Sequence, residues 1–101
     1  MKKIYISGKI SGLDVETYLD NFNSAEEYLN LVYYKVIIVN PVKICSHLNP
    51  VLHTWEDYML VCVENLFKCQ AIYMLDNWKE SRGARIEYAI AKELGIDFIY
   101  E

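Results

Sequence analysis

The chain has 101 residues, 53% of them hydrophobic and 14% aromatic, which is enough apolar material for one domain, residues 1 to 101, with a packed core. The net charge of -4 and the scattered basic residues exclude a binding surface for duplex nucleic acid, and the apolar runs are far shorter than the roughly 20 residues that span a bilayer. The three cysteines form no disulfide framework, so we expect a protein of the reducing cytoplasm without a membrane partner.

The first 41 residues predict two strands with a long helix between them. Lys3 to Ser7 is a short run of β-forming residues. Asp14 is suited to the N-cap of a helix, and apolar residues recur every three or four positions from Tyr18 to Val32, as one face of a helix requires. The β-branched run from Lys35 to Val39 ends at Asn40-Pro41, which indicates a second strand, buried on both faces.

An irregular connection and a second helix are predicted next. Residues 42 to 53 show no sustained periodicity and contain Pro50, so we expect no regular element there. Thr54 and Asp57 have the spacing of a capping box, and apolar residues then repeat at helical spacing as far as Leu66.

The last third of the chain predicts two more strands around a third helix. Ala71 to Leu75 is an apolar strand, followed by a polar loop from Asp76 to Arg82. A helical pattern runs from about Gly83 to Leu94 and ends at Gly95, and Asp97 to Tyr100 forms a final strand.

Strands that alternate with helices in this way predict an α/β fold with a parallel sheet and helices on both faces. Ligands of such folds bind at the carboxyl ends of the strands, where the strand order reverses. The loops after the first and third strands, Gly8 to Leu13 and Asp76 to Arg82, are therefore the expected walls of a site.

Glu87 is the residue most indicative of function, because it shares a helix face with the small residues Ala84 and Ala91. An unpaired carboxylate on an apolar face must find hydrogen-bond donors, shift its pKa upward or line a cavity. The competing interpretation is a salt bridge to a neighbour such as Arg85 or Lys92, and the periodicity alone does not decide between the two.

Three aromatic side chains lie near the expected site. Tyr5, Tyr73 and Trp78 fall at or just after strand ends, where flat rings can stack on a base. The alternative for the two tyrosines is that they pack the sheet against its helices. The glycines of Gly8 to Gly12 are reminiscent of a phosphate loop, but the spacing is not that of a Walker motif.

No metal or cofactor site is predicted. Cys45, His47 and His53 lack the paired ligand spacing of a zinc site, so we interpret the histidines as surface or packing residues. Cys62 lies on the apolar stripe of its helix and is expected to be a small core residue rather than a nucleophile.

Two motifs resemble the nucleoside 2-deoxyribosyltransferase superfamily, which includes the 2'-deoxynucleoside 5'-monophosphate N-glycosidases. They are Tyr5-x-x-Gly8-x-Ile10-x-Gly12 and Ser81-x-Gly83-x-x-x-Glu87. Nearly the whole chain is similar to a small bacterial and phage branch described as a domain of unknown function. The shared features include an Asn-Pro after the second strand and an Asn-Trp in the loop after the third. The resemblance implies a flavodoxin/Rossmann-like three-layer sandwich with a four- to five-stranded, mainly parallel sheet.

The resemblance also implies an N-glycosidase or deoxyribosyltransferase activity on a nucleoside or nucleotide. Glu87 takes the place of the nucleophile that attacks the anomeric carbon, and Tyr5 would orient that carboxylate or the sugar. No cofactor is implied, and a homo-oligomer, a dimer or higher, is expected. The expected substrate-binding residues are Gly8, Lys9, Ile10, Ser11, Gly12, Asp76, Asn77, Trp78, Ser81 and Gly83.

Two departures from the family pattern leave a second function open. Cys62 and Gln70 stand where the family usually has acidic residues, and a glutamate without an acid partner can bind a nucleotide without hydrolysing it quickly. The alternative is therefore a non-catalytic protein that binds, and thereby sequesters, a nucleotide signal. A purely structural oligomerisation module would account for the fold but not for Glu87.

Overall fold

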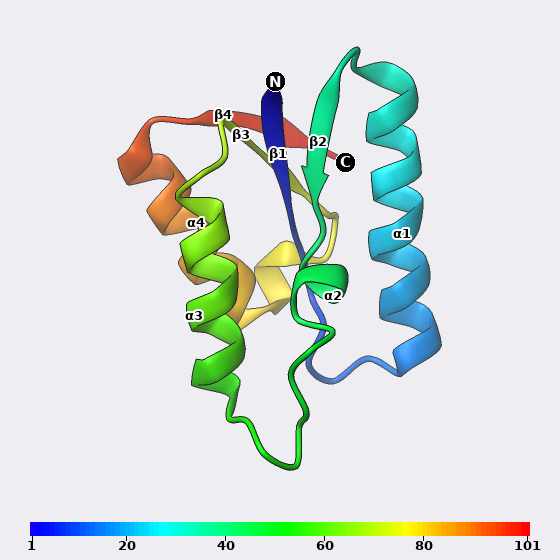
Figure 1. Ribbon diagram of the computed structural model, residues 1–101, viewed down its shortest axis with the longest axis vertical. Coiled ribbons are helices and arrows are strands. Elements are labelled where there is room, and N and C mark those ends of the chain that lie inside the picture. Colours follow the sequence, from blue (N-terminus) through cyan, green and yellow to red (C-terminus); the bar gives the residue numbers. More distant parts are fainter.

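Four parallel strands form the centre of the molecule, and helices cover both faces of their sheet (Figure 1). The computed structural model describes all residues from 1 to 101. The strand order is β2-β1-β3-β4, and every neighbouring pair is parallel. The expected flavodoxin/Rossmann-like three-layer sandwich is therefore confirmed. The strands are β1 (Lys2–Ser7), β2 (Val36–Val39), β3 (Ala71–Met74) and β4 (Asp97–Tyr100).

Three long helices build the two outer layers. Helix α1 (Val15–Val32) covers one face of the sheet, and α3 (Trp55–Leu66) and α4 (Arg82–Leu94) cover the other (Figure 1). The predicted caps are present: the Asp14 side chain accepts a hydrogen bond from the backbone of Thr17, a complete capping box begins α3, and α4 ends at a left-handed glycine. Local capping chemistry thus determines where each helix begins.

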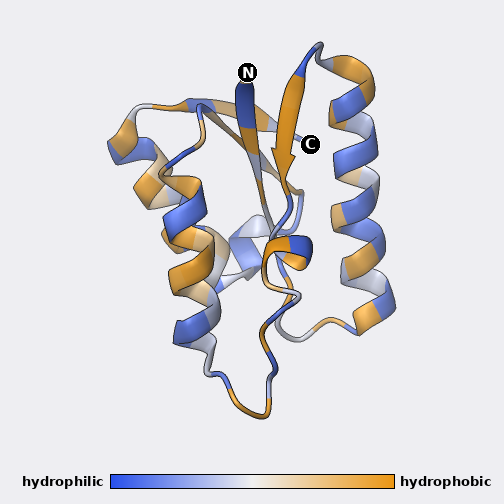
Figure 2. Cartoon of the chain, viewed as in Figure 1, coloured by the Kyte–Doolittle hydropathy of each residue, from blue (hydrophilic) through white to orange (hydrophobic).

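The alternation of side chains along β1 separates two cores. Ile4 and Ile6 point towards α1 and pack against Phe22 and Leu29. Tyr5 points to the opposite face and packs against residues of α3 and α4. Figure 2 shows hydrophobic colour along most of β2 and mixed colour along the helices, as expected of helices with one buried and one exposed side. Because a strand has a period of two residues, Ser7 follows Tyr5 to the α3 and α4 side.

Strand β2 differs from the sequence prediction. It was expected to be buried on both faces, but it is an edge strand with β1 as its one neighbour, and Ile37 is 42% exposed. The β-branched composition of the run predicted a strand correctly, but composition does not report where a strand lies within the sheet.

The connection after β2 also corrects a prediction. Residues 42 to 53 were expected to be irregular, yet a one-turn helix, α2 (Pro41–Ile44), begins there. Asn40 caps it by accepting a hydrogen bond from the backbone of Val42, and Pro41 occupies the first turn, where its missing N–H costs nothing. A 3₁₀ turn, η1 (Trp78–Glu80), similarly lies within the polar loop after β3.

The strand order places a crevice at the carboxyl ends of β1 and β3. The chain leaves β1 through α1 towards β2 on one side, and it then passes back across β1 to reach β3 on the other side. The loops after β1 and β3 diverge at this point, as they do at the binding crevice of open α/β sheets. No helix combines the length and the apolar character that are needed to span a bilayer.

Candidate functional site

A buried carboxylate lies at the centre of this crevice. Glu87, on α4, is only 5% exposed and faces β1. The Tyr5 hydroxyl donates a hydrogen bond of 2.7 Å to Oε2, and the Ser7 hydroxyl donates one of 2.7 Å to Oε1. Each carboxylate oxygen therefore has its own hydroxyl donor, and both donors come from the same face of β1.

No cation neutralises Glu87. The interpretation as a salt bridge is wrong, because Arg85 donates instead to the backbone oxygen of Lys79 and the Lys92 ammonium lies over the ring of Tyr88. Burial raises the pKa of the Glu87 carboxyl to about 7, and the two hydroxyl donors oppose that rise. The carboxyl group is thus poised to change its protonation state near neutral pH.

Tyr5 is kept in its neutral, donating form. Its side chain is fully buried, and burial raises the pKa of the phenol, with a further contribution from the charge of Glu87. A phenol that cannot readily ionise beside a carboxylate remains a hydrogen-bond donor to it. This arrangement fits the orienting role expected of Tyr5, although the role itself stays a prediction.

A cleft of about 580 Å³ opens from Glu87 to the surface. This volume is within the range of pockets that hold small-molecule ligands. About half of the side chains along it are hydrophobic. The cleft is lined by Gly8, Ile10, Ser11, Tyr18, Phe22, Pro41, Val42, Cys45, Ser46, Leu48, Pro50, Trp55, Tyr58, Met59, Cys62, Glu80, Ser81, Arg82, Gly83, Ala84 and Glu87.

Two glycines shape the loop after β1. A Cβ atom on Gly8 would lie 2.5 Å from Cδ1 of Leu75, so only glycine allows the backbone to pass this close to the end of β3. Gly12 has a φ of +90°, a conformation that side chains disfavour. The backbone N–H of Lys9 donates to Oδ1 of Asn77 at 3.0 Å, and this bond joins the two loops.

The structure brings only part of the predicted site to the cleft. Tyr5 lies behind Glu87 and contacts it directly. Among the expected substrate-binding residues, the ones that line the cleft are Gly8, Ile10, Ser11, Ser81 and Gly83. The ones that do not are Lys9, Gly12, Asp76, Asn77 and Trp78.

Four of the five residues away from the cleft have contacts elsewhere. Asn77 holds the loop after β1, and the backbone N–H of Asp76 donates to the Glu101 side chain. The ring of Trp78 stacks on Tyr88 with centroids 4.5 Å apart, so one face of this ring is already covered. Lys9 lies 4.0 Å from Glu80 at the cleft rim. The bond between Lys9 and Asn77 thus joins the two loops, whereas Asp76 and Trp78 contact other parts of the chain.

Tyr73 also lies outside the cleft. Its side chain belongs to the core on the α1 side, where its ring is 6.1 Å from that of Tyr28. The packing alternative is therefore correct for Tyr73. Tyr5 lies on the neighbouring strand β1 and points to the opposite face of the sheet, where it is buried and donates a hydrogen bond to Glu87.

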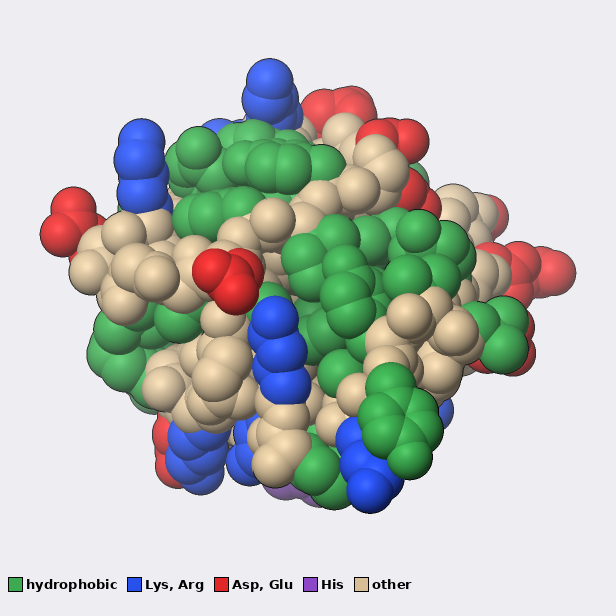
Figure 3. Space-filling view, turned by 90° about the horizontal axis from the view of Figure 1, so that it is seen from above, with side chains coloured by type: hydrophobic (Ala, Val, Ile, Leu, Met, Phe, Trp, Pro, Cys, Tyr) green, Lys and Arg blue, Asp and Glu red, His purple; other side chains and the backbone are tan.

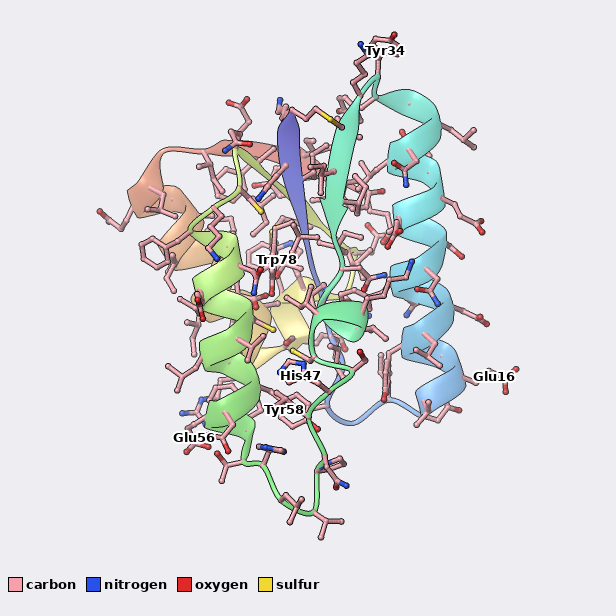
Figure 4. All side chains as sticks on the ribbon, viewed as in Figure 1. Glu16, Tyr34, His47, Glu56, Tyr58 and Trp78 are labelled. Atoms are coloured by element: carbon pink, nitrogen blue, oxygen red, sulfur yellow. The ribbon has the colours of Figure 1, made fainter.

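Sequence reasoning missed the wall of the cleft that faces the loops. It is formed by α2, by the segment after α2 and by the first turns of α3, including Trp55, Tyr58 and Met59. Figure 4 shows Tyr58 on α3 next to the segment that contains His47. Ser7 was also missed, although its position two residues after Tyr5 would have indicated a second hydroxyl on the same strand face.

Positive charge and free backbone donors gather at the amino end of α4. Ser81 caps this helix by accepting from the backbone of Ala84 at 3.1 Å, and both Ser81 and Gly83 line the cleft. The Arg82 guanidinium lies 4.5 Å from the ring centroid of Trp55. The first turn of a helix has backbone N–H groups without intrahelical acceptors, so this end of the cleft is suited to an anionic group.

Cys62 and Gln70, which stand where the resembled superfamily usually has acidic residues, lie in different parts of the structure. Cys62 lines the cleft, and its thiol is among the groups that raise the pKa of Tyr5, after burial and Glu87. Gln70 precedes β3 at the opposite end of the sheet, where its side chain accepts from the backbone of Lys3. Only the departure at Cys62 therefore bears on the environment of Glu87.

The histidines do not line the cleft. His47 is exposed, and Nδ1 of His53 accepts from the backbone N–H of Asn49 at 2.9 Å. These contacts agree with the expected surface and packing roles.

A comparison with known families gives one match. The model described as "Domain of unknown function (DUF4406)" matches residues 2 to 100. No curated protein and no solved structure matches the chain.

Proposed function

Since the chain belongs to the DUF4406 family, whose description leaves its activity open, we propose a function from the site itself: the protein binds a nucleoside or nucleotide and cleaves its N-glycosidic bond with Glu87 as nucleophile. The observation that carries this proposal is the isolated, buried carboxylate of Glu87, held by Tyr5 and Ser7 at the base of a cleft of ligand size. The likeness of the motifs around Tyr5 and Glu87 to the nucleoside 2-deoxyribosyltransferase superfamily supports the choice of reaction.

The chemistry requires a carboxylate that is positioned rather than free. Attack by one oxygen of Glu87 on the anomeric carbon would form a glycosyl ester and release the base, and water or a second base would then resolve the ester. Two short hydrogen bonds restrain the carboxylate, and the absence of a paired cation leaves its charge available for the sugar carbon. Burial of the carboxylate charge also favours a transition state in which that charge is dispersed.

The rest of the cleft fits the other parts of such a ligand. The amino end of α4, with Ser81 and Gly83, would receive a 5'-phosphate, and Arg82 would add positive charge. The apolar and aromatic part of the cleft wall that includes Tyr58 would receive the base. We therefore expect nucleoside monophosphates to bind more tightly than nucleosides.

One observation favours a second candidate, a nucleotide-binding protein that does not cleave its ligand. Departure of the base requires a proton donor, and Cys62 occupies the cleft position at which the family usually has an acid. The other carboxyl group that lines the cleft, Glu80, is largely exposed and lies 4.0 Å from the Lys9 ammonium. In this second function, Glu87 would accept a hydrogen bond from a sugar hydroxyl.

A screen of the wild-type protein distinguishes the two candidates. Chromatography would detect free base after incubation with each common deoxynucleoside and its 5'-monophosphate, and a melting scan would detect binding. Base release above a no-protein control supports the enzyme. Stabilisation without base release supports the binding protein, and neither effect with any compound would contradict both proposals.

We also propose that the chain self-associates in the cytoplasm. Phe67, which is 59% exposed, lies with Ala89, Ile90 and Leu94 along a shallow apolar groove between the end of α3 and α4. Figure 3, which views the end of the molecule that carries the amino terminus, shows apolar areas between charged side chains. Apolar surface of this kind is commonly covered by a symmetric copy of the same chain.

A further inference from the structure

Two cysteines from different elements meet in the wall of the cleft. Cys45 is the C-cap of α2 and Cys62 lies within α3, and their Sγ atoms are 3.7 Å apart. Both thiols are free and buried from bulk solvent, and both residues line the cleft. The two sulfurs are therefore in mutual contact and face a space that small molecules can enter.

We propose that Cys45 and Cys62 form a redox-responsive dithiol, which hydrogen peroxide or another small hydroperoxide converts to a disulfide. A disulfide bond has an S–S length of about 2.05 Å, so the two sulfurs must approach by roughly 1.7 Å. Cys45 lies at the end of a one-turn helix that continues into a loop of eight residues before α3 capping begins at Thr54. The approach would be made by this short element, which is joined to α3 through that loop.

The oxidation proceeds in two balanced steps. The Cys45 thiolate attacks one peroxide oxygen, which forms a sulfenic acid and releases hydroxide, and the hydroxide takes the thiol proton to become water. The Cys62 sulfur then attacks the sulfenic sulfur, a second water leaves, and the S–S bond forms. In total, two thiols and one peroxide give one disulfide and two waters, and each sulfur gives up one electron.

The environments of the two thiols agree with this order. The hydrogen bond between the thiols lowers the pKa of Cys45 and raises that of Cys62, whose burial raises it further. Cys45 is thus the thiol that more readily provides a thiolate, and Cys62 is the one that resolves the sulfenic acid.

Cys69 provides an internal control. It is buried, does not line the cleft, and donates from its Sγ to the backbone oxygen of Asn65 at 3.4 Å. Burial raises the pKa of this thiol to about 11. We expect it to stay reduced under conditions that oxidise the other two.

The disulfide would act on the cleft itself. It would tie the residues between positions 45 and 62, which include the lining residues Trp55 and Tyr58, into a closed loop. It would also remove a thiol from beside Tyr5, the hydroxyl donor to Glu87. These consequences do not depend on which ligand the cleft binds, so the proposal stands apart from the proposed function.

Mass spectrometry of the folded wild-type protein tests the proposal. After treatment with hydrogen peroxide, unfolding and alkylation, we expect a chain that has lost two hydrogens and carries one alkyl group, with reversal by dithiothreitol. Cleavage after Glu56 separates the two cysteines into different peptides, and the expected product is the pair linked by a disulfide. No lysine or arginine lies between them, so trypsin would leave both on one peptide.

Variants and a second readout complete the test. Cys69→Ser should form the disulfide as the wild type does, whereas Cys45→Ser should not. The melting temperature of oxidised wild type should lie above that of the reduced protein, because a cross-link restricts the unfolded chain. Three alkylatable thiols after peroxide treatment, or a disulfide that includes Cys69 or joins two chains, would overturn the proposal.

Discussion

Tyr5 and Glu87 are 82 positions apart in the sequence, yet the phenol donates a hydrogen bond of 2.7 Å to the carboxylate inside the core. The contact joins the first strand of the sheet to the last helix, and Ser7 adds a second bond between the same two elements. The candidate reacting group is therefore carried by a helix and held by one central strand, β1, rather than by a loop.

Removal of the carboxylate should separate catalysis from binding. If Glu87 is the nucleophile, Glu87→Ala should abolish base release while ligand-induced stabilisation remains, because the groups that would bind phosphate lie at the amino end of α4. If the protein only binds, the same variant should lose no more than about 1 to 3 kcal/mol of affinity. Chromatography and melting scans measure the two effects. Glu27→Ala, which changes an exposed glutamate of α1 that lines neither the cleft nor the groove, is the control and should behave as the wild type.

The stability of the protein should depend on pH through Glu87. Burial raises the pKa of this carboxyl from an ordinary 4.5 to about 7, so between these values the folded chain keeps a proton that the unfolded chain releases. The full stabilisation is present below about pH 4.5, and it is lost as pH rises through 7, by about 3 kcal/mol in total. Urea titrations of wild type and Glu87→Gln from pH 5 to 8 measure this loss. A wild type as insensitive to pH as the variant would contradict it.

The two hydroxyl donors should control the protonation of Glu87. Their hydrogen bonds stabilise the carboxylate, so Tyr5→Phe and Ser7→Ala should each raise its pKa, by about one unit. If the protein is an enzyme, the rising limb of its pH–rate profile should shift to higher pH in each variant. Whether or not it is an enzyme, the infrared band of the Glu87 carboxylate should appear at a higher pH in each variant. Tyr73→Phe, on the opposite face of the sheet, should leave both unchanged. Identical titrations in all three variants would exclude the assigned roles.

A side chain at position 8 should destabilise the folded protein. In Gly8→Ala the new methyl group would lie 2.5 Å from Leu75 Cδ1 and 2.9 Å from its Cβ, so the end of β3 or the loop must move, at a cost of about 1 to 3 kcal/mol. Gly12→Ala meets nothing closer than 3.7 Å and should cost about 1 kcal/mol through its positive φ alone. Chemical denaturation measures both. Equal losses in the two variants would argue against the close packing at Gly8.

Self-association should depend on the groove between α3 and α4. We expect light scattering at micromolar concentration to give at least a dimer, and Phe67→Glu to reduce the mass to that of one chain. Leu31→Glu changes an apolar residue of α1 that is 87% exposed, and it should leave the oligomer intact. A wild-type monomer would contradict the proposal, and a dimer that survives Phe67→Glu would place the interface elsewhere.

Most of the fold was predictable because its signals are local. Helix caps at Asp14 and Thr54, the helical periodicity and the alternation of strands with helices all act over a few residues. The edge position of β2 was not predictable, because strand order depends on contacts between distant segments. Helix α2 was missed because four residues are too few to show a period, although Asn40-Pro41 is a typical helix start.

Only one wall of the site was predictable from the sequence. Residues of the loops after β1 and β3 could be placed together because parallel strands end at a common edge. The opposite wall comes from α2, from the segment after it and from α3, and no local pattern specifies how these pack against the two loops. Trp78 was expected at the site because it follows the third strand, whereas its stacking on Tyr88 depends on the packing of η1 on α4, which no local pattern specifies.

The wall of the cleft and the group around Glu87 come from different segments of the chain. Ten of its 21 lining residues lie between Pro41 and Cys62, a single uninterrupted segment between two strands, whereas Glu87 and its hydroxyl donors belong to β1 and α4. A designer can therefore randomise or replace the stretch from Ser46 to His53 as one cassette, and select for new ligands, while the carboxylate keeps its surroundings. The same separation would let related chains differ in the wall of the cleft and retain a common buried carboxylate.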